Sequence, residues 1–227
     1  MNLMNRQQSG HSGELSISKG QSEHGVVVGN TYDKYSARNP IVRLIMRGFE
    51  RALQGLVANC APKSIHEVGC GEGYWTLLWA EQGFDVRGSD FSDMVVSMAR
   101  SNASARGLNQ NMFRCRSVYD LNPIEDCSDL LVCCEVLEHL EHPSEALEVL
   151  RAVGARRVIL SVPREPLWSF MNMARGKYWS DFGNTPGHIQ RWSQETFLSL
   201  VGQYFHIREV RAPLPWTMVL AEPREIM

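Results

Sequence analysis

The sequence predicts an α/β fold with a doubly wound, mostly parallel sheet of seven strands. From residue 64 to residue 162, short apolar runs rich in β-branched residues alternate with segments of helical period. Strands that alternate with helices of roughly 10 to 15 residues indicate right-handed βαβ units around a parallel sheet. At 227 residues, 44% of them hydrophobic and 21% charged, the chain has the size and composition of one soluble globular domain.

The expected elements follow one another without an internal repeat. A helix comes first, because Asn39-Pro40 is a helix-start signal and apolar residues recur at spacings of three and four up to Val57. The next elements are strand 64–68, helix 73–82, strand 85–89, helix 92–106, strands 111–116 and 128–134, helix 143–153 and strand 157–162. The last three are a helix at 194–202 and strands at 206–211 and 216–221.

Two regions depart from this alternation. Residues 1–25 are polar and poor in aromatic residues, which predicts a disordered leader, so a single domain would occupy residues 26–227. Within it, residues 163–192 are rich in Trp, Phe, Met, Tyr, Gly and Pro, and a long irregular insertion is usually functional. We interpret residues 163–192 as a lid over the substrate, although its apolar residues could equally form a small satellite core.

Charge and composition exclude several classes of protein. The formal net charge of -2 gives no global field that would attract DNA or anionic lipid. No apolar run reaches the roughly 18 residues that a membrane span needs, and the first residues lack the apolar core of a signal peptide. The six cysteines form no C-x-x-C pair, so we expect reduced thiols in a cytoplasmic protein.

A glycine-rich turn follows the first predicted strand of the sheet. Its glycines are Gly69, Gly71 and Gly73, and Tyr74 stands where a dinucleotide-binding loop needs its third glycine. This spacing disfavours NAD. The other large user of such a loop is S-adenosylmethionine, which has no phosphate but carries an ammonium, a carboxylate, a sulfonium, a ribose diol and an adenine. A tight strand-to-helix turn is the structural alternative.

The glycine turn and the end of the second strand together resemble class I S-adenosylmethionine-dependent methyltransferases. The resemblance implies that Glu67 helps to hold the methionine end and that the glycines let the backbone approach the cofactor. It also implies that Asp90 accepts the ribose hydroxyls and that Phe91 packs on the adenine. Further cofactor contacts expected on this basis are Cys70, Ser117, Val118, Glu135 and Arg38, with Tyr35 beside Arg38 at the methionine carboxylate.

A segment of unusual chemistry follows the strand at 128–134. Glu135, Glu138 and His139 have the spacing i, i+3, i+4, which would put them on one face of a helical turn and would suit Mg²⁺, Mn²⁺ or Zn²⁺. The run E-V-L-E-H resembles quinone-biosynthesis O-methyltransferases and, more distantly, small-RNA 3′-terminal 2′-O-methyltransferases. In those families this face is implicated in metal binding, and the RNA enzymes use a further histidine, whose place His188 would take.

The same residues also allow a site without metal. Glu135 would then contact the cofactor, and Glu138 would face solvent or a basic neighbour. His188 is in that case the first candidate for the general base and His139 the second, because the ordinary pKa of imidazole, about 6.5, suits proton removal near neutral pH.

The function expected from these features is transfer of a methyl group from S-adenosylmethionine to a small molecule. The aromatic lid predicts an apolar or aromatic acceptor with a polar group, and we expect a hydroxyl oxygen to be methylated. Basic lid residues such as Arg164 and Arg191 would meet an anionic group of the acceptor or only keep the lid soluble. The alternatives are a metal-dependent RNA 3′-end 2′-O-methyltransferase and a non-catalytic, cofactor-binding partner subunit.

Overall fold

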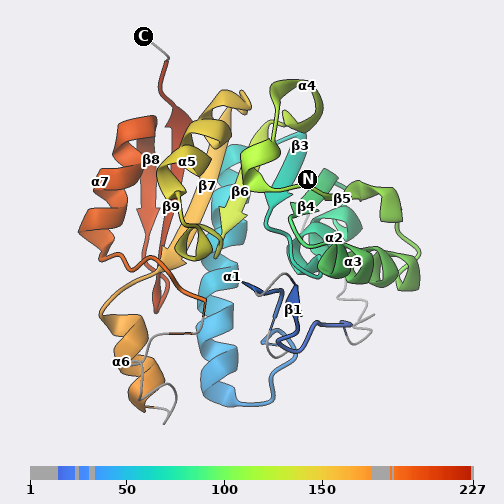
Figure 1. Ribbon diagram of the computed structural model, residues 1–227, viewed down its shortest axis with the longest axis horizontal. Helices are drawn as coiled ribbons and strands as arrows, with labels where there is room; N and C mark the ends of the chain where they lie inside the picture. The colour runs from blue at the N-terminus through green and yellow to red at the C-terminus, as the bar shows by residue number, and fades with distance from the viewer. Residues whose placement is uncertain (1–14, 24–25, 31–33, 175–184, 186, 226–227) are drawn as a thin grey trace, which may run out of the picture.

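A seven-stranded sheet forms the centre of the molecule (Figure 1). The computed structural model describes residues 15–23, 26–30, 34–174, 185 and 187–225. The strand order is β5-β4-β3-β6-β7-β9-β8, and β9 runs antiparallel to both β7 and β8 while the other neighbours are parallel. The strands are β3 (Ser64–Val68), β4 (Asp85–Asp90), β5 (Phe113–Cys115), β6 (Leu130–Cys134), β7 (Arg157–Pro163), β8 (Phe205–Arg211) and β9 (Trp216–Pro223). The predicted fold class is confirmed.

The predicted helices are present, with ends that differ by at most three residues. They are α1 (Pro40–Cys60), α2 (Tyr74–Glu81), α3 (Asp93–Ala105), α5 (Pro143–Ala152) and α7 (Gln194–Tyr204). The shorter elements are α4 (Pro123–Asp126) and three 3₁₀ turns, η1 (Gln110–Met112), η2 (Val118–Asp120) and η3 (Leu137–His139). β5 begins later than expected because Asn109 accepts a hydrogen bond from the Asn111 N–H and starts η1 instead.

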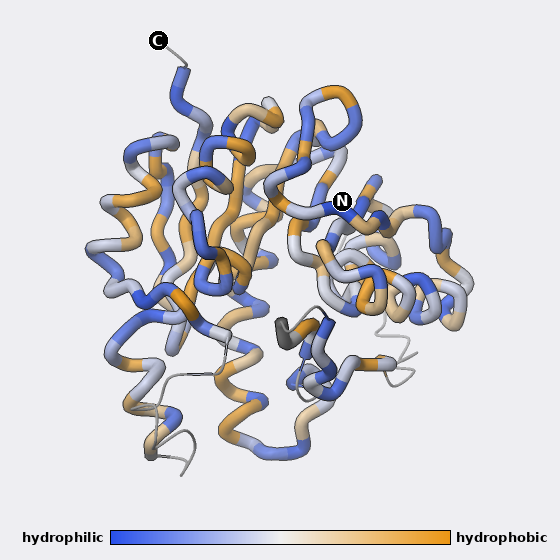
Figure 2. The backbone as a smooth tube through the Cα atoms, viewed as in Figure 1, coloured by the Kyte–Doolittle hydropathy of each residue, from blue (hydrophilic) through white to orange (hydrophobic). Residues whose placement is uncertain are grey.

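Helices cover both faces of the sheet. In β6, Leu130 and Val132 pack on the side of α1 and α2, whereas Leu131 and Cys133 pack on the side of α5 and α7. Successive side chains of a strand point to opposite faces, so a strand buried on both faces reads as a continuous apolar run. Figure 2 shows the corresponding hydrophobic colour along the central strands.

The two halves of α1 have different surroundings. The second half buries Phe49, Leu53 and Leu56 against the sheet. The first half extends past the ends of the strands (Figure 1), and there Ile41 is 64% and Leu44 is 67% exposed. The apolar stripe predicted for this helix is therefore used for packing only where the sheet lies beneath it.

Part of the expected leader is packed against the domain. Leu15 and Ser18 are buried, and β1 (Ser22–Glu23) pairs antiparallel with β2 (Val26–Val27). The prediction of disorder is wrong for residues 15–23, because long-range hydrogen bonds described below hold this segment. Residues 1–14 and 24–25 lie outside the described residues.

The expected lid contains a helix. α6 (Leu167–Ala174) occupies its first part, so this part is not the irregular chain that the composition predicted. Residues 175–184 and 186 of the lid lie outside the described residues. Among the described helices, none is long and apolar enough to cross a membrane, and all six cysteines are free thiols.

Candidate active site

The glycine turn lies where the strand order of the sheet reverses. β3 has β4 on one side and β6 on the other, and open α/β sheets bind their ligands at the carboxyl ends of strands at such a point. A Cβ on Gly69 would lie 2.2 Å from Val136 Cγ2, so packing excludes a side chain there. Gly71, with φ +54°, has open space where its Cβ would be. The backbone at Gly71 therefore borders an open space in which a ligand can bind.

Asp90 connects the end of β4 to the glycine turn. Its Oδ2 accepts a hydrogen bond from Gly71 N at 3.0 Å, and its Oδ1 accepts one from Ser92 N at 3.1 Å. Burial raises the pKa of Asp90, and these backbone donors oppose the rise. Phe91, the next residue, is 48% exposed. The structure thus places a fixed carboxylate and an exposed aromatic ring next to each other at this edge.

Glu67 lies under the same turn and is 6% exposed. Its Oε2 accepts hydrogen bonds from the backbone N–H, at 2.8 Å, and from the hydroxyl of Thr76. Burial raises the pKa of Glu67 to about 8 despite these donors. An ammonium group beside Glu67 would favour its charged form. Thr76 was missed by the sequence analysis, although it lies on the first turn of the helix that follows the glycines.

The remaining cofactor candidates lie in the glycine turn and after β5, where Arg116 N donates to the Asp90 carbonyl at 2.8 Å. Cys70 is buried within the turn, and a Cβ on Gly73 would come within 2.6 Å of Phe113. Ser117 caps η2 by accepting a hydrogen bond from Tyr119 N at 3.3 Å, and Val118 is buried.

The segment before α1 contacts the start of α2 through aromatic rings. Tyr35 stacks on Tyr74, with ring centroids 3.5 Å apart and ring planes 5° from parallel. Arg38 is exposed, and within the described part of the chain no hydrogen bond or ion pair joins it to the glycine turn. Of the two residues expected at the methionine carboxylate, the structure brings only Tyr35 to the edge of the seat.

Glu135 is not part of the group that the other predicted metal ligands form. It follows β6 with φ 60°, a backbone conformation uncommon outside glycine and typical of functional sites. Its carboxylate accepts hydrogen bonds from Trp216 Nε1 at 2.6 Å and from Ser161 Oγ at 3.3 Å. The single helical face predicted for Glu135, Glu138 and His139 is therefore wrong, because the helical turn begins only at Leu137.

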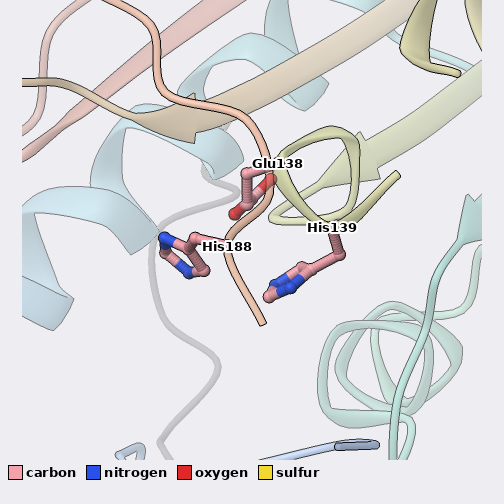
Figure 3. A group of neighbouring side chains, drawn as sticks. All are labelled: Glu138, His139 and His188. Atoms are coloured by element: carbon pink, nitrogen blue, oxygen red, sulfur yellow. The ribbon is translucent and has the colours of Figure 1, made fainter. Parts of the chain in front are cut away.

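Glu138, His139 and His188 do meet, and one ligand atom from each lies within 4.8 Å of the others. Figure 3 shows the three side chains where the turn after β6 meets the segment that carries His188. Glu138 is buried, His188 is half-buried and His139 is exposed. Neither carboxylate oxygen of Glu138 has a hydrogen-bond partner among the described residues. A buried carboxylate without a donor is costly unless a cation binds it.

Backbone hydrogen bonds hold the two segments together. Ile189 N and Gln190 N both donate to the Glu138 carbonyl, at 2.8 and 3.0 Å. His139 Nδ1 lies 2.8 Å from the Gly187 carbonyl. Because a carbonyl can only accept, Nδ1 carries the proton and Nε2 keeps the lone pair that can bind a metal.

Aromatic packing and burial shape the surroundings of His188. The ring of Trp168, on α6, stacks on His188 with centroids 5.8 Å apart, and Trp168 Nε1 donates to Thr185 Oγ1 at 2.9 Å. Burial lowers the pKa of His188 to about 3, and the neighbouring charges of His139 and Arg191 add to this effect. Burial also raises the pKa of Glu138 well above its ordinary value. The lowered pKa values keep both imidazoles neutral, as metal ligands must be. Two neutral imidazoles and a carboxylate fit a divalent cation of the zinc or manganese type.

Comparison with known proteins finds similarity to methyltransferases. Residues 66–160 match the family described as methyltransferase domain. The ubiquinone biosynthesis O-methyltransferase of Coxiella burnetii is 30% identical over 86 residues, which cover 38% of this chain and 36% of that protein. The match thus spans about a third of the curated relative's length.

Solved structures show the same fold. Magnesium protoporphyrin IX methyltransferase from Synechocystis PCC 6803, with bound S-adenosylhomocysteine, is 21% identical, with a TM-score of 0.63 and coverage of 83% of this chain and 90% of that one. The methyltransferase domain of bacterial CtHen1 is 20% identical, with a TM-score of 0.60 and coverage of 78% and 99%. The chain has the class I S-adenosylmethionine-dependent methyltransferase fold, and its residues 66–160 match a methyltransferase domain.

Proposed function

We propose that this protein transfers a methyl group from S-adenosylmethionine to a hydroxyl oxygen of a small molecule. S-adenosylmethionine as the methyl donor is supported by the seat that the bare backbone at Gly71 and the carboxylate of Asp90 form. Gly71 N donates a hydrogen bond to Asp90 Oδ2 at 3.0 Å and so holds this carboxylate in place. In this seat Asp90 binds the ribose hydroxyls, the exposed ring of Phe91 stacks on the adenine, and buried Glu67 faces the methionine ammonium.

Methyl transfer needs the acceptor oxygen in line with the sulfonium methyl. Alignment of the two reactants lowers the activation barrier by at most about 7 to 11 kcal/mol. Removal of the hydroxyl proton lowers the barrier further. Glu138 and His139 follow β6 and, with His188, form a group close to the glycine turn, whose Gly69 packs against Val136. We therefore propose that the acceptor hydroxyl binds beside these three residues.

A divalent cation held by Glu138, His139 and His188 is part of the proposal. The unpartnered carboxylate of Glu138 and the orientation of His139 by the Gly187 carbonyl support it. When bound, the cation would act as a Lewis acid that makes the acceptor hydroxyl more acidic. Without metal, His188 and then His139 would accept the proton, but an imidazole whose pKa is about 3 is a weak acceptor near neutral pH.

A second candidate is methylation of an RNA 3′ end. The cluster of one carboxylate and two histidines favours it, together with the resemblance of the E-V-L-E-H run and His188 to enzymes of that class. A basic surface wide enough for a nucleic-acid strand would have to accompany it. The net charge of -2 makes the small-molecule acceptor the better-supported proposal.

Calorimetric titration with S-adenosylmethionine, with and without a chelator, tests the proposal. We expect the cofactor to bind in both cases, and Asp90→Ala to weaken it at least about tenfold because the ribose hydroxyls lose their acceptor. Transfer of a tritiated methyl group to phenols, sugars, amines or RNA ends should then stop when the chelator removes the cation.

Three results would change the assignment. Failure of the wild-type protein to bind the cofactor at millimolar concentration contradicts it outright. Binding without transfer to any acceptor favours a non-catalytic partner subunit. Transfer that is restricted to RNA ends favours the second candidate.

A further inference from the structure

A small polar hollow lies beside the cofactor seat. It has a volume of about 170 Å³ and is bounded by α1, by Lys34 and Tyr35, and by the first residues of α2. Lys34, Arg43 and Arg47 contribute three cations to its wall, and Glu50 contributes the one carboxylate. The hollow therefore carries a local excess of positive charge in a chain whose net charge is -2.

Among the described residues, none forms an ion pair with these three cations. Within the described part of the chain, no ion pair or hydrogen bond involves the side chain of Lys34, Arg43 or Arg47. Lys34 Nζ makes a cation–π contact with Tyr35, at 5.4 Å from the centroid of the ring. Arg43 and Arg47 lie four residues apart on α1, a spacing at which like charges destabilise a helix. An anion bound between them would offset this repulsion.

The hollow adjoins the glycine turn of the proposed cofactor seat. Tyr35 and Tyr74 form its stacked aromatic wall, and Tyr74 follows directly after the last glycine of the turn. Burial raises the pKa of Glu67 to about 8, and the charge of Lys34 is near enough to oppose that rise. A group bound in the hollow would therefore lie close to the methionine end of the cofactor.

The size of the hollow limits what it can hold. Pockets for whole drug-sized ligands have volumes of roughly 300 to 1,000 Å³, so a hollow of about 170 Å³ suits one small group of a larger molecule. Arginine presents a fork of N–H donors that matches the oxygens of a carboxylate or a phosphate. The chemistry of the wall therefore selects an anionic oxygen group.

We propose that Lys34, Arg43 and Arg47 form an anion subsite that binds a phosphate or carboxylate group of the methyl acceptor. This inference rests on the proposed function and narrows it to anionic acceptors. The carboxylate of the cofactor is the other possible source of the same chemistry. An experiment on the subsite must therefore be done with the cofactor seat already occupied.

The test is a calorimetric titration of the full chain with inorganic pyrophosphate, in the presence of saturating S-adenosylhomocysteine. We expect binding that weakens with added salt and that falls at least about tenfold in the double variant Arg43→Gln, Arg47→Gln. Arg51→Gln is the matched control, because Arg51 is an exposed arginine on the same helix outside the hollow. All variants should bind S-adenosylhomocysteine as the wild type does, and circular dichroism should show an unchanged fold.

Each other outcome has a defined meaning. If pyrophosphate competes with S-adenosylhomocysteine and the double variant loses affinity for both, the hollow holds the cofactor carboxylate and the inference is overturned. Equal pyrophosphate affinity in the double variant and in Arg51→Gln also overturns it, as does no binding to the wild type. If S-adenosylhomocysteine itself does not bind, the proposed function fails, and titration of the unliganded protein with pyrophosphate still reports on the hollow.

Discussion

Glu138 is the residue whose environment is hardest to explain without a ligand. Its carboxylate is 1% exposed, lacks a donor among the described residues, and faces two imidazoles. Ordinary packing would supply a hydroxyl or an N–H group to such an acid, as Trp216 and Ser161 do for Glu135. The contrast between these two glutamates indicates that the Glu138 carboxylate binds a ligand that is not part of the chain.

Substitution of His188 tests this interpretation at one residue. His188→Ala should lower methyl transfer at least about tenfold, and zinc affinity by a similar factor, because the site loses one of its three ligands. Affinity for S-adenosylhomocysteine should stay the same, since the cofactor seat is built from other elements. Turnover assays and two calorimetric titrations measure these effects.

His206→Ala provides the control, because His206 is exposed on β8, the edge strand that β7 and β9 separate from β6. Wild-type turnover in His188→Ala would remove His188 from any catalytic role. Reduced turnover with unchanged zinc affinity would support the general-base role instead.

The N-terminal segment is the element that the sequence described least well. Glu72, inside the glycine turn, accepts hydrogen bonds from Ser18 N at 3.0 Å, from Asn30 N at 2.8 Å and from Asn30 Nδ2 at 2.6 Å. Asn102 of α3 also bonds to both backbone groups of Ser16. One buried acid thus gathers two distant parts of the chain at the rim of the cofactor seat.

Loss of the Glu72 carboxylate should release this segment. We expect Glu72→Ala to speed hydrogen exchange at the Ser18 and Asn30 amides by at least about tenfold, and to lower the free energy of unfolding by about 1 to 3 kcal/mol, because buried donors lose their acceptor. Exchange measured by mass spectrometry and urea unfolding report the two effects. The matched variant Glu81→Gln changes an exposed acid and should alter neither. Unchanged exchange at both amides would show that other contacts hold the segment.

Buried ionisable groups make the stability of the whole molecule depend on pH. His66, 1% exposed in β3, lies between the Asp126 carbonyl and the Ser89 hydroxyl, at 3.1 and 2.9 Å. Burial lowers its pKa to about 4. Between about pH 6.5 and pH 4 the unfolded chain binds a proton at His66 and the folded chain does not, so His66 lowers stability as the pH falls through this range.

The comparison of wild type with His66→Gln isolates this effect. From pH 7 to pH 5, the free energy of unfolding of the wild type should fall by about 2 kcal/mol relative to the variant, which cannot be protonated there. Buried Glu67 and Glu135 act with the opposite sign, because their raised pKa values favour the folded state as the pH falls, but they are common to both proteins. Urea unfolding followed by tryptophan fluorescence measures the difference. A difference that does not change with pH would mean that His66 is not buried in its neutral form.

Most of the sheet and the cofactor seat could be predicted because their signals are local. The apolar run Leu130 to Cys134 is buried on both faces whatever lies far away in the chain, and the glycines after β3 are required by the turn they make. Glu67 and Asp90 end neighbouring parallel strands, so the topology alone brings them to one edge. The candidate metal ligands were proposed by type and spacing, and the helical turn assumed to join Glu135 to Glu138 and His139 begins only at Leu137.

Contacts between distant segments had no local signal. Nothing near Glu72 in the chain indicates that Ser18 and Asn30 would supply its donors, and nothing near Lys34 indicates that it shares a hollow with Arg43 and Arg47. The succession of strands and helices along the chain and the glycine turn follow from the amino-acid sequence, because periodicity and turn geometry act over a few residues. The meeting of Glu138 with His188, the docking of residues 15–23 and the charge of the hollow arise only when the packed sheet brings separate segments together.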